Sequence, residues 1–274
     1  MELCEQLCRS LSSSEESFSS SSEEEGPDEK LLAVLCESIQ TPLGLGVLAA
    51  AASLVVYLPQ EKQALCLSGS SDVVFHVEEN AAATSFAKDG LWVVAFRGTE
   101  LSQWKDVADD VDVWRKPLYW ASSSYVHEGF LRHYLKLQAS VLKEFLLQTQ
   151  QRGIDRVLIT GHSLGGTSAY LTASFFAFLC QSLMFSGRLV CKTFGCPRIG
   201  DAGFFRWCSS ALSGTVDSAC YVNSSDLVAR VPLQLSENWV HRSIVFRRKE
   251  APFKAHSMEN YFKATLQQEL LETT

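Results

Sequence analysis

One short segment, Gly161-His162-Ser163-Leu164-Gly165, restricts the folds open to this chain more than any other. It follows directly on Val157–Thr160, an apolar run of strand length, and leads into Thr167–Cys180, which is long enough for a helix. A turn from a buried strand straight into a helix is tight and strained, and its central residue projects from the sheet. Side chains two residues either way would meet the neighbouring strand and helix, which explains both glycines. The segment therefore predicts a strand–turn–helix unit with Ser163 at its apex.

A serine hydroxyl at such an apex is typical of the nucleophile in acyl transfer. The start of the following helix brings backbone N–H groups and the positive end of the helix dipole close to it. The same five residues could also arise by chance in a chain that contains many Gly and Ser. The strand before the segment and the long helix after it favour the functional interpretation. We therefore expect Ser163 to be a nucleophile.

The rest of the chain alternates between strand-like and helix-like segments. Strands are predicted near residues 73–77, 92–96, 157–160, 189–194, 219–222 and 243–246, and helices near 130–152, 165–182, 203–212 and 257–272. Buried strands separated by helices predict an α/β fold with a mainly parallel central sheet and helices on both faces.

An apolar run of sixteen residues, Leu43–Leu58, comes before these segments. A membrane-spanning helix needs about 20 apolar residues, so the run is short for that role. Pro42 and Pro59 frame it, and its small side chains allow close backbone packing. We predict a buried core helix here rather than a membrane span.

The acidic charge of the chain is concentrated at its start. Residues 1–30 hold nine acidic and two basic side chains, which account for the net charge of -7, whereas residues 31–274 are balanced. A Ser- and Glu-rich tract cannot bury enough apolar surface to offset its chain entropy. We expect a disordered acidic tail over 1–30 and one globular domain over 31–274. The balanced domain has no net basic charge to attract nucleic acid.

The cysteines and the first residues bear on location and on bound groups. The nine cysteines are odd in number and lack the spacing of paired metal ligands. Residues 1–5 are acidic, where a signal peptide would be basic. These features predict reduced thiols and an intracellular, cytoplasmic protein. The sequence shows no metal-ligand cluster, phosphate-binding glycine loop or dinucleotide fingerprint, so neither a metal nor a cofactor is expected.

Five segments stand in the order found in one known family. They cover residues 93–99, 126–130, 161–166, 194–201 and 221–228. Together they resemble the class 3, or fungal-type, lipase family, and the resemblance extends over about Leu43 to Leu271. It implies the α/β-hydrolase fold and the hydrolysis of carboxylic esters in acylglycerols or phospholipids.

A serine nucleophile needs a base to accept its proton and a carboxylate to orient that base. In the α/β-hydrolase fold these follow the serine in the order acid, then histidine. His256, before the last predicted helix, matches the family position and is preferred to His241. Asp226 lies at the carboxyl end of a predicted strand and matches a family segment. The alternatives for the acid, which we expect to be structural or at the wrong end of a strand, are Asp201 and Asp217.

The oxyanion of the tetrahedral intermediate needs hydrogen-bond donors. One is expected to be the backbone N–H of Leu164, directly after the nucleophile. The resemblance places the other at Thr99, in the loop after the strand at 92–96. Two further histidines, His127 and His162, are interpreted as structural.

Residues 101–114 carry apolar side chains every three or four positions with aspartates between them. If helical, this stretch is amphipathic. In the family, the stretch after the Thr99 position forms a lid over the site, and an ordinary helix packed on the core is the alternative.

These features predict a serine ester hydrolase acting on lipid acyl esters, of the acylglycerol lipase or phospholipase A1 type. The expected partner is a lipid ester substrate, with transient contact at a membrane or lipid-droplet surface. The alternative is a lipase-like interaction or scaffold protein without turnover, although such a protein is expected to lack a triad residue.

Overall fold

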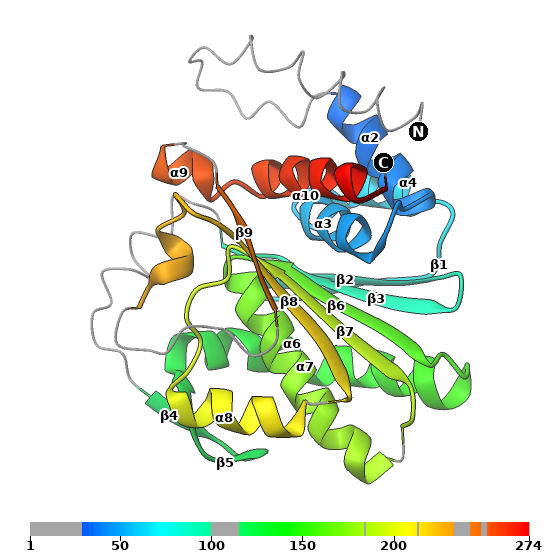
Figure 1. Cartoon of the computed structure of the whole chain (residues 1–274). Helices are drawn as coiled ribbons and strands as arrows, with labels where there is room; N and C mark the ends of the chain where they lie inside the picture. The colour runs from blue at the N-terminus through cyan, green and yellow to red at the C-terminus, as the bar shows by residue number, and fades with distance from the viewer. Residues whose placement is uncertain are drawn as a thin grey trace.

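The computed structural model describes residues 29–99, 115–183, 185–212, 214–232, 242–247 and 251–273 (Figure 1). At its centre is a seven-stranded sheet in the order β1-β2-β3-β6-β7-β8-β9. Its strands are β1 (Ser71–Glu78), β2 (Ala81–Lys88), β3 (Leu91–Phe96), β6 (Arg156–His162), β7 (Arg188–Phe194), β8 (Val216–Asn223) and β9 (Arg242–Phe246). The strands from β3 to β9 pair in parallel, and β1 to β3 form an antiparallel meander. The predicted mainly parallel sheet is confirmed.

Helices cover both faces of this sheet, as predicted (Figure 1). One layer holds α2 (Glu29–Gln40), α3 (Leu45–Val55), α4 (Gln60–Cys66) and α10 (Met258–Thr273), and the other holds α6 (Glu128–Leu146), α7 (Leu164–Leu183) and α8 (Ala202–Ala211). Helix α3 packs against both α10 and β6, while α7 packs on β6 and β7 from the opposite side. The carboxyl ends of the parallel strands therefore meet at one edge between two helical layers.

The sheet divides the core into two parts, and the side chains of β3 point alternately into one and the other. Trp92 and Val94 point into the cluster under α6, α7 and α8, whereas Val93 and Ala95 point into the cluster under α2, α3 and α10. All four are buried, because successive side chains of a strand face opposite sides of the sheet. A strand buried on both faces needs the continuous apolar run that the sequence shows.

The apolar run at residues 43–58 forms α3, a buried helix, as predicted. Its four consecutive alanines, Ala49–Ala52, are almost fully buried, and their small side chains let the helix lie close to the sheet. Ser53 Oγ lies 2.8 Å from Thr160 Oγ1 on β6, which ties the helix to the strand before the turn. None of the described helices is both long and apolar enough to cross a membrane.

The close fit of α3 predicts that it tolerates little added volume. Ala50→Leu is expected to lower the free energy of unfolding by about 1–3 kcal/mol, because extra methylenes in a packed core force shifts of side chains and backbone. Urea denaturation measures the change. Ala64→Leu, at an exposed position on α4, is the matched control and should change stability by less than about 0.5 kcal/mol. Equal effects at the two sites would contradict the packing argument.

Some elements were not predicted from sequence. Strand β2 is one, because its small residues, Ala81–Ser85, carry neither an alternating nor a strongly apolar pattern. The last turn of the helix predicted to end at Arg152 is a π-helix over Leu147–Gln151. A hairpin of β4 (Arg115–Leu118) and β5 (Ala121–His127) leads into α6. Residues 1–28 of the predicted tail and the stretch 101–114 lie outside the described residues.

Two buried histidines join elements of the fold. His76 contacts Ser140 Oγ at 2.6 Å and Ser85 Oγ at 2.9 Å, which connects β1 with α6 and β2. His133 contacts Ser168 Oγ at 3.0 Å, which connects α6 with α7. Burial lowers the pKa of each imidazole to about 4. Both histidines are therefore neutral in the folded protein at neutral pH.

Because of these two histidines, we expect the folded protein to lose stability on mild acidification. In the unfolded chain their pKa values return to about 6.5, so the unfolded state binds protons first as the pH falls. The free energy of unfolding should therefore decrease between pH 6.5 and 5, above the range where most carboxylates titrate. Urea denaturation at a series of pH values measures this slope. The double variant His76→Gln, His133→Gln should show a smaller slope, and an unchanged slope would contradict the assignment.

Candidate active site

Ser163 stands on the turn between β6 and α7, as the sequence predicts. Its φ of 58° lies in the left-handed region, which is strained for a residue with a β-carbon. Its N–H donates to Phe194 O on β7 at 2.9 Å, so the neighbouring strand holds the turn. A β-carbon on Gly161 would collide with Gly165 O, and one on Gly165 would collide with Phe96 O. Both glycines are therefore required by close backbone contact.

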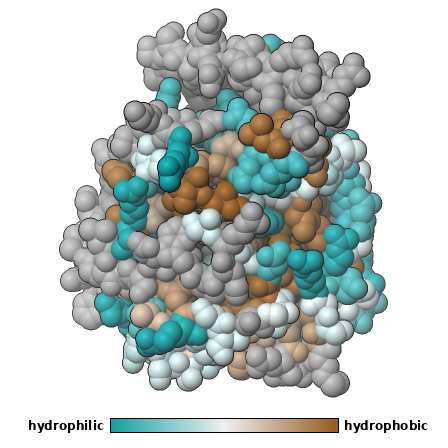
Figure 2. Space-filling view, in the orientation of Figure 1, coloured by the Kyte–Doolittle hydropathy of each residue, from teal (hydrophilic) through white to brown (hydrophobic). Residues whose placement is uncertain are grey.

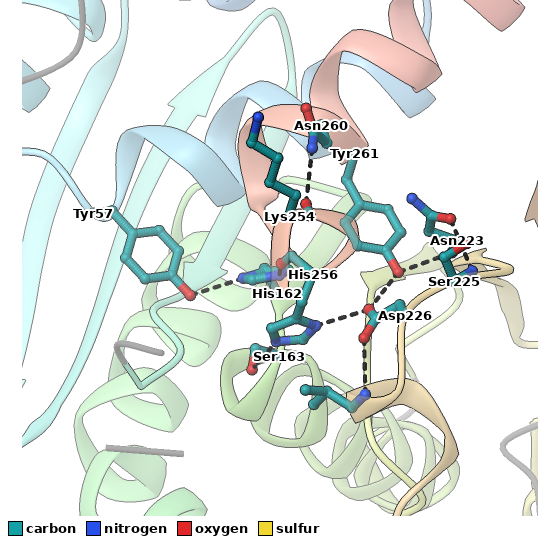
Figure 3. A network of polar contacts seen from close by, with 11 residues as sticks. Tyr57, His162, Ser163, Asn223, Ser225, Asp226, Lys254, His256, Asn260 and Tyr261 are labelled. Carbon is teal, nitrogen blue, oxygen red and sulfur yellow. Dashed lines mark hydrogen bonds and ion pairs between the residues drawn. The ribbon is translucent and has the colours of Figure 1, made fainter. Parts of the chain in front are cut away.

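The structure brings Ser163, His256 and Asp226 together from three separate parts of the chain (Figure 3). Ser163 Oγ lies 2.8 Å from His256 Nε2, and His256 Nδ1 lies 2.7 Å from Asp226 Oδ2. His256 follows the short helix α9 (Pro252–Ala255), and Asp226 follows β8. An ionised carboxylate only accepts hydrogen bonds, so Nδ1 carries the proton and Nε2 can accept from the serine hydroxyl. All three side chains are buried, at no more than 1% exposed.

The Asp226 carboxylate is held by donors on both of its oxygens. Oδ1 accepts from Val228 N–H at 2.8 Å, and Oδ2 accepts from the Tyr261 hydroxyl at 2.7 Å as well as from His256. Tyr261 in turn accepts from Asn223 N–H at 2.9 Å. Burial and the nearby Asp226 carboxylate raise the pKa of Tyr261 above its ordinary value, so the phenol keeps its proton. Three donors around one carboxylate suit an anion.

The loop after β3 passes directly beside the serine. A β-carbon on Gly98 would lie 3.1 Å from Ser163 Cβ, and Thr99, which is half-buried, is the next residue. On the other side, Leu164 is the first residue of α7, so its N–H has no acceptor within the helix. The two residues predicted as oxyanion donors therefore flank the turn.

The other acid candidates are placed elsewhere. Asp201 caps α8 by accepting from Phe204 N–H at 2.8 Å. Asp217 lies near the start of β8, paired with Arg188 at 3.2 Å, and so at the opposite end of that strand from Asp226. These placements agree with the structural roles and the wrong-end position expected for them.

Of the three other histidines considered from the sequence, two lie within the described residues. His127 accepts from Gly129 N–H at 3.1 Å and stacks on Phe130, with ring centroids 4.2 Å apart. His162 is buried between Tyr57 and His256. Both therefore have structural partners, as expected, while His241 lies outside the described residues.

Apolar side chains surround this edge of the sheet. Phe130 and Leu164 form a buried cluster against Val228. Leu227, directly after Asp226, is 55% exposed, and Val245 on β9 is 51% exposed. Ser224 N–H donates to Phe246 O, which brings the loop after β8 to the end of β9. Figure 2 shows hydrophobic surface on this face of the molecule, below α9 and α10 in the view.

Within the described ranges, no group of three or more His, Cys, Asp or Glu side chains could hold a metal ion. The seven cysteines in these ranges are free thiols. Burial raises the pKa of several of them, including Cys191 on β7 and Cys196 just after that strand. A protonated, buried thiol is a poor nucleophile.

Sequence reasoning missed two tyrosines. The sequence places Tyr261 in a predicted helix and Tyr57 near the end of an apolar run. In the structure, the Tyr261 hydroxyl contacts Asp226 and the Tyr57 hydroxyl contacts His162, and both of these residues are partners of His256 (Figure 3). Tyr261 lies on α10, which begins just after His256, but no local pattern marks its hydroxyl as a partner of Asp226. No local signal marks Tyr57, which is more than 100 residues from its partner His162.

Solved structures of fungal lipases resemble this arrangement of sheet and helices. The triacylglyceride lipase of Rhizomucor miehei is 22% identical with a TM-score of 0.55, over 76% of this chain and 77% of that chain. Lipase II of Rhizopus niveus is 20% identical with a TM-score of 0.57, over 76% and 77%. A variant of MDLA from Penicillium cyclopium is 15% identical with a TM-score of 0.58, over 82% and 83%. This likeness shows the fold, which is the α/β-hydrolase fold.

Sequence comparison gives the family. A lipase of Rhizomucor miehei is 31% identical over 140 residues, which make up 51% of this chain and 37% of that lipase. The chain thus matches little more than a third of the length of this curated relative. The model of the family described as "Lipase (class 3)" matches residues 93–236, which is more than half of the chain. This chain belongs to the class 3 lipase family.

Proposed function

We propose that this chain is a serine ester hydrolase that acts on the acyl esters of lipids. The observation that carries the proposal is the continuous series of hydrogen bonds from Ser163 through His256 to Asp226. Each residue is of the type, and in the order, that acyl transfer requires in this fold. Family membership supports the same chemistry.

In the first half of the proposed reaction, Ser163 Oγ attacks the ester carbonyl carbon while His256 Nε2 takes the hydroxyl proton. Asp226 keeps the proton of the imidazole on Nδ1 and stabilises the imidazolium that forms. The backbone N–H groups of Leu164 and Thr99 stabilise the oxyanion, and the Thr99 hydroxyl is a further donor. His256 then protonates the leaving alcohol, and the acyl group stays on Ser163.

In the second half, His256 removes a proton from water, which attacks the acyl carbonyl. The same donors hold the second oxyanion. When the tetrahedral intermediate collapses, the proton on His256 Nε2 returns to Ser163 Oγ, and the fatty acid is released. None of these steps needs more than the side chains and backbone groups named here.

The apolar side chains at the site support a lipid as substrate. The cluster of Phe130, Leu164 and Val228 provides an apolar surface against which an acyl chain can pack. Leu227 and Val245 are exposed near the same edge, where they suit transient contact with a membrane or lipid-droplet surface. Acylglycerols and phospholipids cleaved at the first acyl position both fit this description.

A fluorophosphonate probe tests the proposal, because it reacts with a serine only where a base and oxyanion donors activate it. Purified full-length protein should take up one probe per chain, measured by intact mass, and Ser163→Ala should take up none. Release of fatty acid from monoacylglycerol, diacylglycerol and phosphatidylcholine, measured in parallel, distinguishes the substrate classes.

The competing function is a lipase-like scaffold without turnover. It predicts a folded wild-type protein that is neither labelled nor active, including in detergent micelles that would open a covered site. That result would overturn the proposed function. Labelling without hydrolysis of any lipid ester would retain the serine chemistry and reject the lipid substrate.

A further inference from the structure

A second series of hydrogen bonds runs behind the serine, on the side away from Asp226 (Figure 3). Gly98 N–H donates to the Tyr57 hydroxyl at 3.0 Å, and that hydroxyl lies 3.0 Å from His162 Nδ1. His162 Nε2 lies 2.7 Å from the backbone carbonyl oxygen of His256. The series therefore connects the loop after β3, the end of α3, the turn at Ser163 and the His256 backbone.

The chemistry of the groups fixes the protons in this series. The His256 carbonyl can only accept, so His162 Nε2 must carry a proton. Burial, with His256 nearby, lowers the pKa of His162 well below its ordinary value, so the ring is neutral and Nδ1 has no proton. Tyr57 accepts from Gly98 and uses its own O–H to donate to Nδ1. Gly98, Tyr57 and His162 therefore all donate in one direction, towards the His256 carbonyl, which only accepts.

Three segments also meet sterically at Gly98. A β-carbon there would collide with Tyr57 Oη and with His162 O, and would lie 3.1 Å from Ser163 Cβ. Arg97 N–H donates to Ala82 O and Gly98 N–H donates to Tyr57, so of the described residues of this loop, 97–99, it is Thr99 whose N–H is left to face an oxyanion. The hydroxyl of Tyr57 thus sits where it can fix the oxyanion loop and the His256 backbone in one frame.

We propose that Tyr57 is a positioning residue for ester hydrolysis: through Gly98 it holds the loop that bears Thr99, and through His162 it holds the backbone of His256 against Ser163. The inference rests on the proposed function. Tyr57 does not need to touch the reacting atoms. Its effect comes from geometry, since the attack requires His256 Nε2 and the oxyanion donors to be placed together to within a fraction of an ångström.

Tyr57→Phe tests this role, because it removes the hydroxyl and keeps the ring that packs edge-on against His162 at 5.9 Å between centroids. We expect kcat to fall by about 10- to 100-fold with KM changed by less than about 2-fold. The probe should still label one serine per chain, but more slowly. Tyr134→Phe, at a buried tyrosine on α6, is the matched control and should keep wild-type kcat.

A ¹⁵N spectrum of histidine-labelled protein supplies a readout that general damage to the fold would not move. The signal lost in His162→Gln identifies His162, which should be neutral with its proton on Nε2. In Tyr57→Phe its Nδ1 resonance should shift, because the donor is gone. A proton on Nδ1 in the wild type would overturn the proposed direction of the series.

The outcomes separate the two proposals. Wild-type kcat and labelling rate in a folded Tyr57→Phe protein would overturn the positioning role and leave the ester hydrolase intact. A fall in kcat matched by an equal fall in the labelled fraction would show a loss of folded protein, which also overturns it. An unlabelled, inactive wild type would overturn the proposed function, and with it a positioning role in hydrolysis.

Discussion

Ser163→Ala is expected to lower kcat for a soluble short-chain ester by about 10⁵- to 10⁶-fold, the largest effect of any single exchange in this chain. Without the hydroxyl no acyl-enzyme can form, so only water attack assisted by the oxyanion donors remains. The strained turn loses no backbone contact, because the Ser163 N–H still donates to Phe194 O. Ester hydrolysis by purified protein, with circular dichroism as a check of folding, measures the effect.

The matched control for this exchange is Ser168→Ala. Ser168 is also buried on α7 and also faces a histidine, His133, at 3.0 Å. Its loss should reduce stability by about 1 kcal/mol through the broken hydrogen bond and leave kcat within about 2-fold of the wild type. Substantial activity in Ser163→Ala, or its loss in folded Ser168→Ala, would show that another group is the nucleophile.

Asp226→Asn is expected to lower kcat by about 10⁴-fold at neutral pH. An amide can donate as well as accept, so it no longer obliges His256 to keep its proton on Nδ1, and the imidazolium loses its counter-charge. In the wild type, Asp226 Oδ2 also accepts from the Tyr261 hydroxyl at 2.7 Å. An amide in place of the carboxylate weakens this hydrogen bond as well. We expect KM to change little, because Asp226 is fully buried and does not face the substrate. Steady-state kinetics over substrate concentration separates kcat from KM.

Asp217→Asn controls for the removal of one negative charge from the same strand. Asp217 lies at the other end of β8, is paired with Arg188 and is exposed. Its exchange should change kcat by less than about 2-fold and stability by less than about 1 kcal/mol, as is usual for surface ion pairs. Full activity in Asp226→Asn would refute its assignment as the acid.

Much of the fold could be predicted because its signals are local. The strand–turn–helix unit around Ser163 is encoded by adjacent residues: an apolar run, glycines at the two crowded positions and a long helix. The buried helix α3 followed from its length and its alanines. Strand β2 could not be predicted, because its small residues carry no local strand pattern. Its place is decided by pairing with β1 and β3.

The sequence by itself determined the candidate chemistry: Ser163 from its turn, His256 and Asp226 from their order, their flanking elements and the family resemblance, and the family from five ordered segments. Only the tertiary structure decided how these groups are held. Tyr57, in the turn after α3, and Tyr261, on α10, reach the site from distant parts of the chain, and each contributes a hydroxyl whose partners are set by packing. Hydrogen bonds of this kind depend on distances between elements, which no local pattern in the chain records.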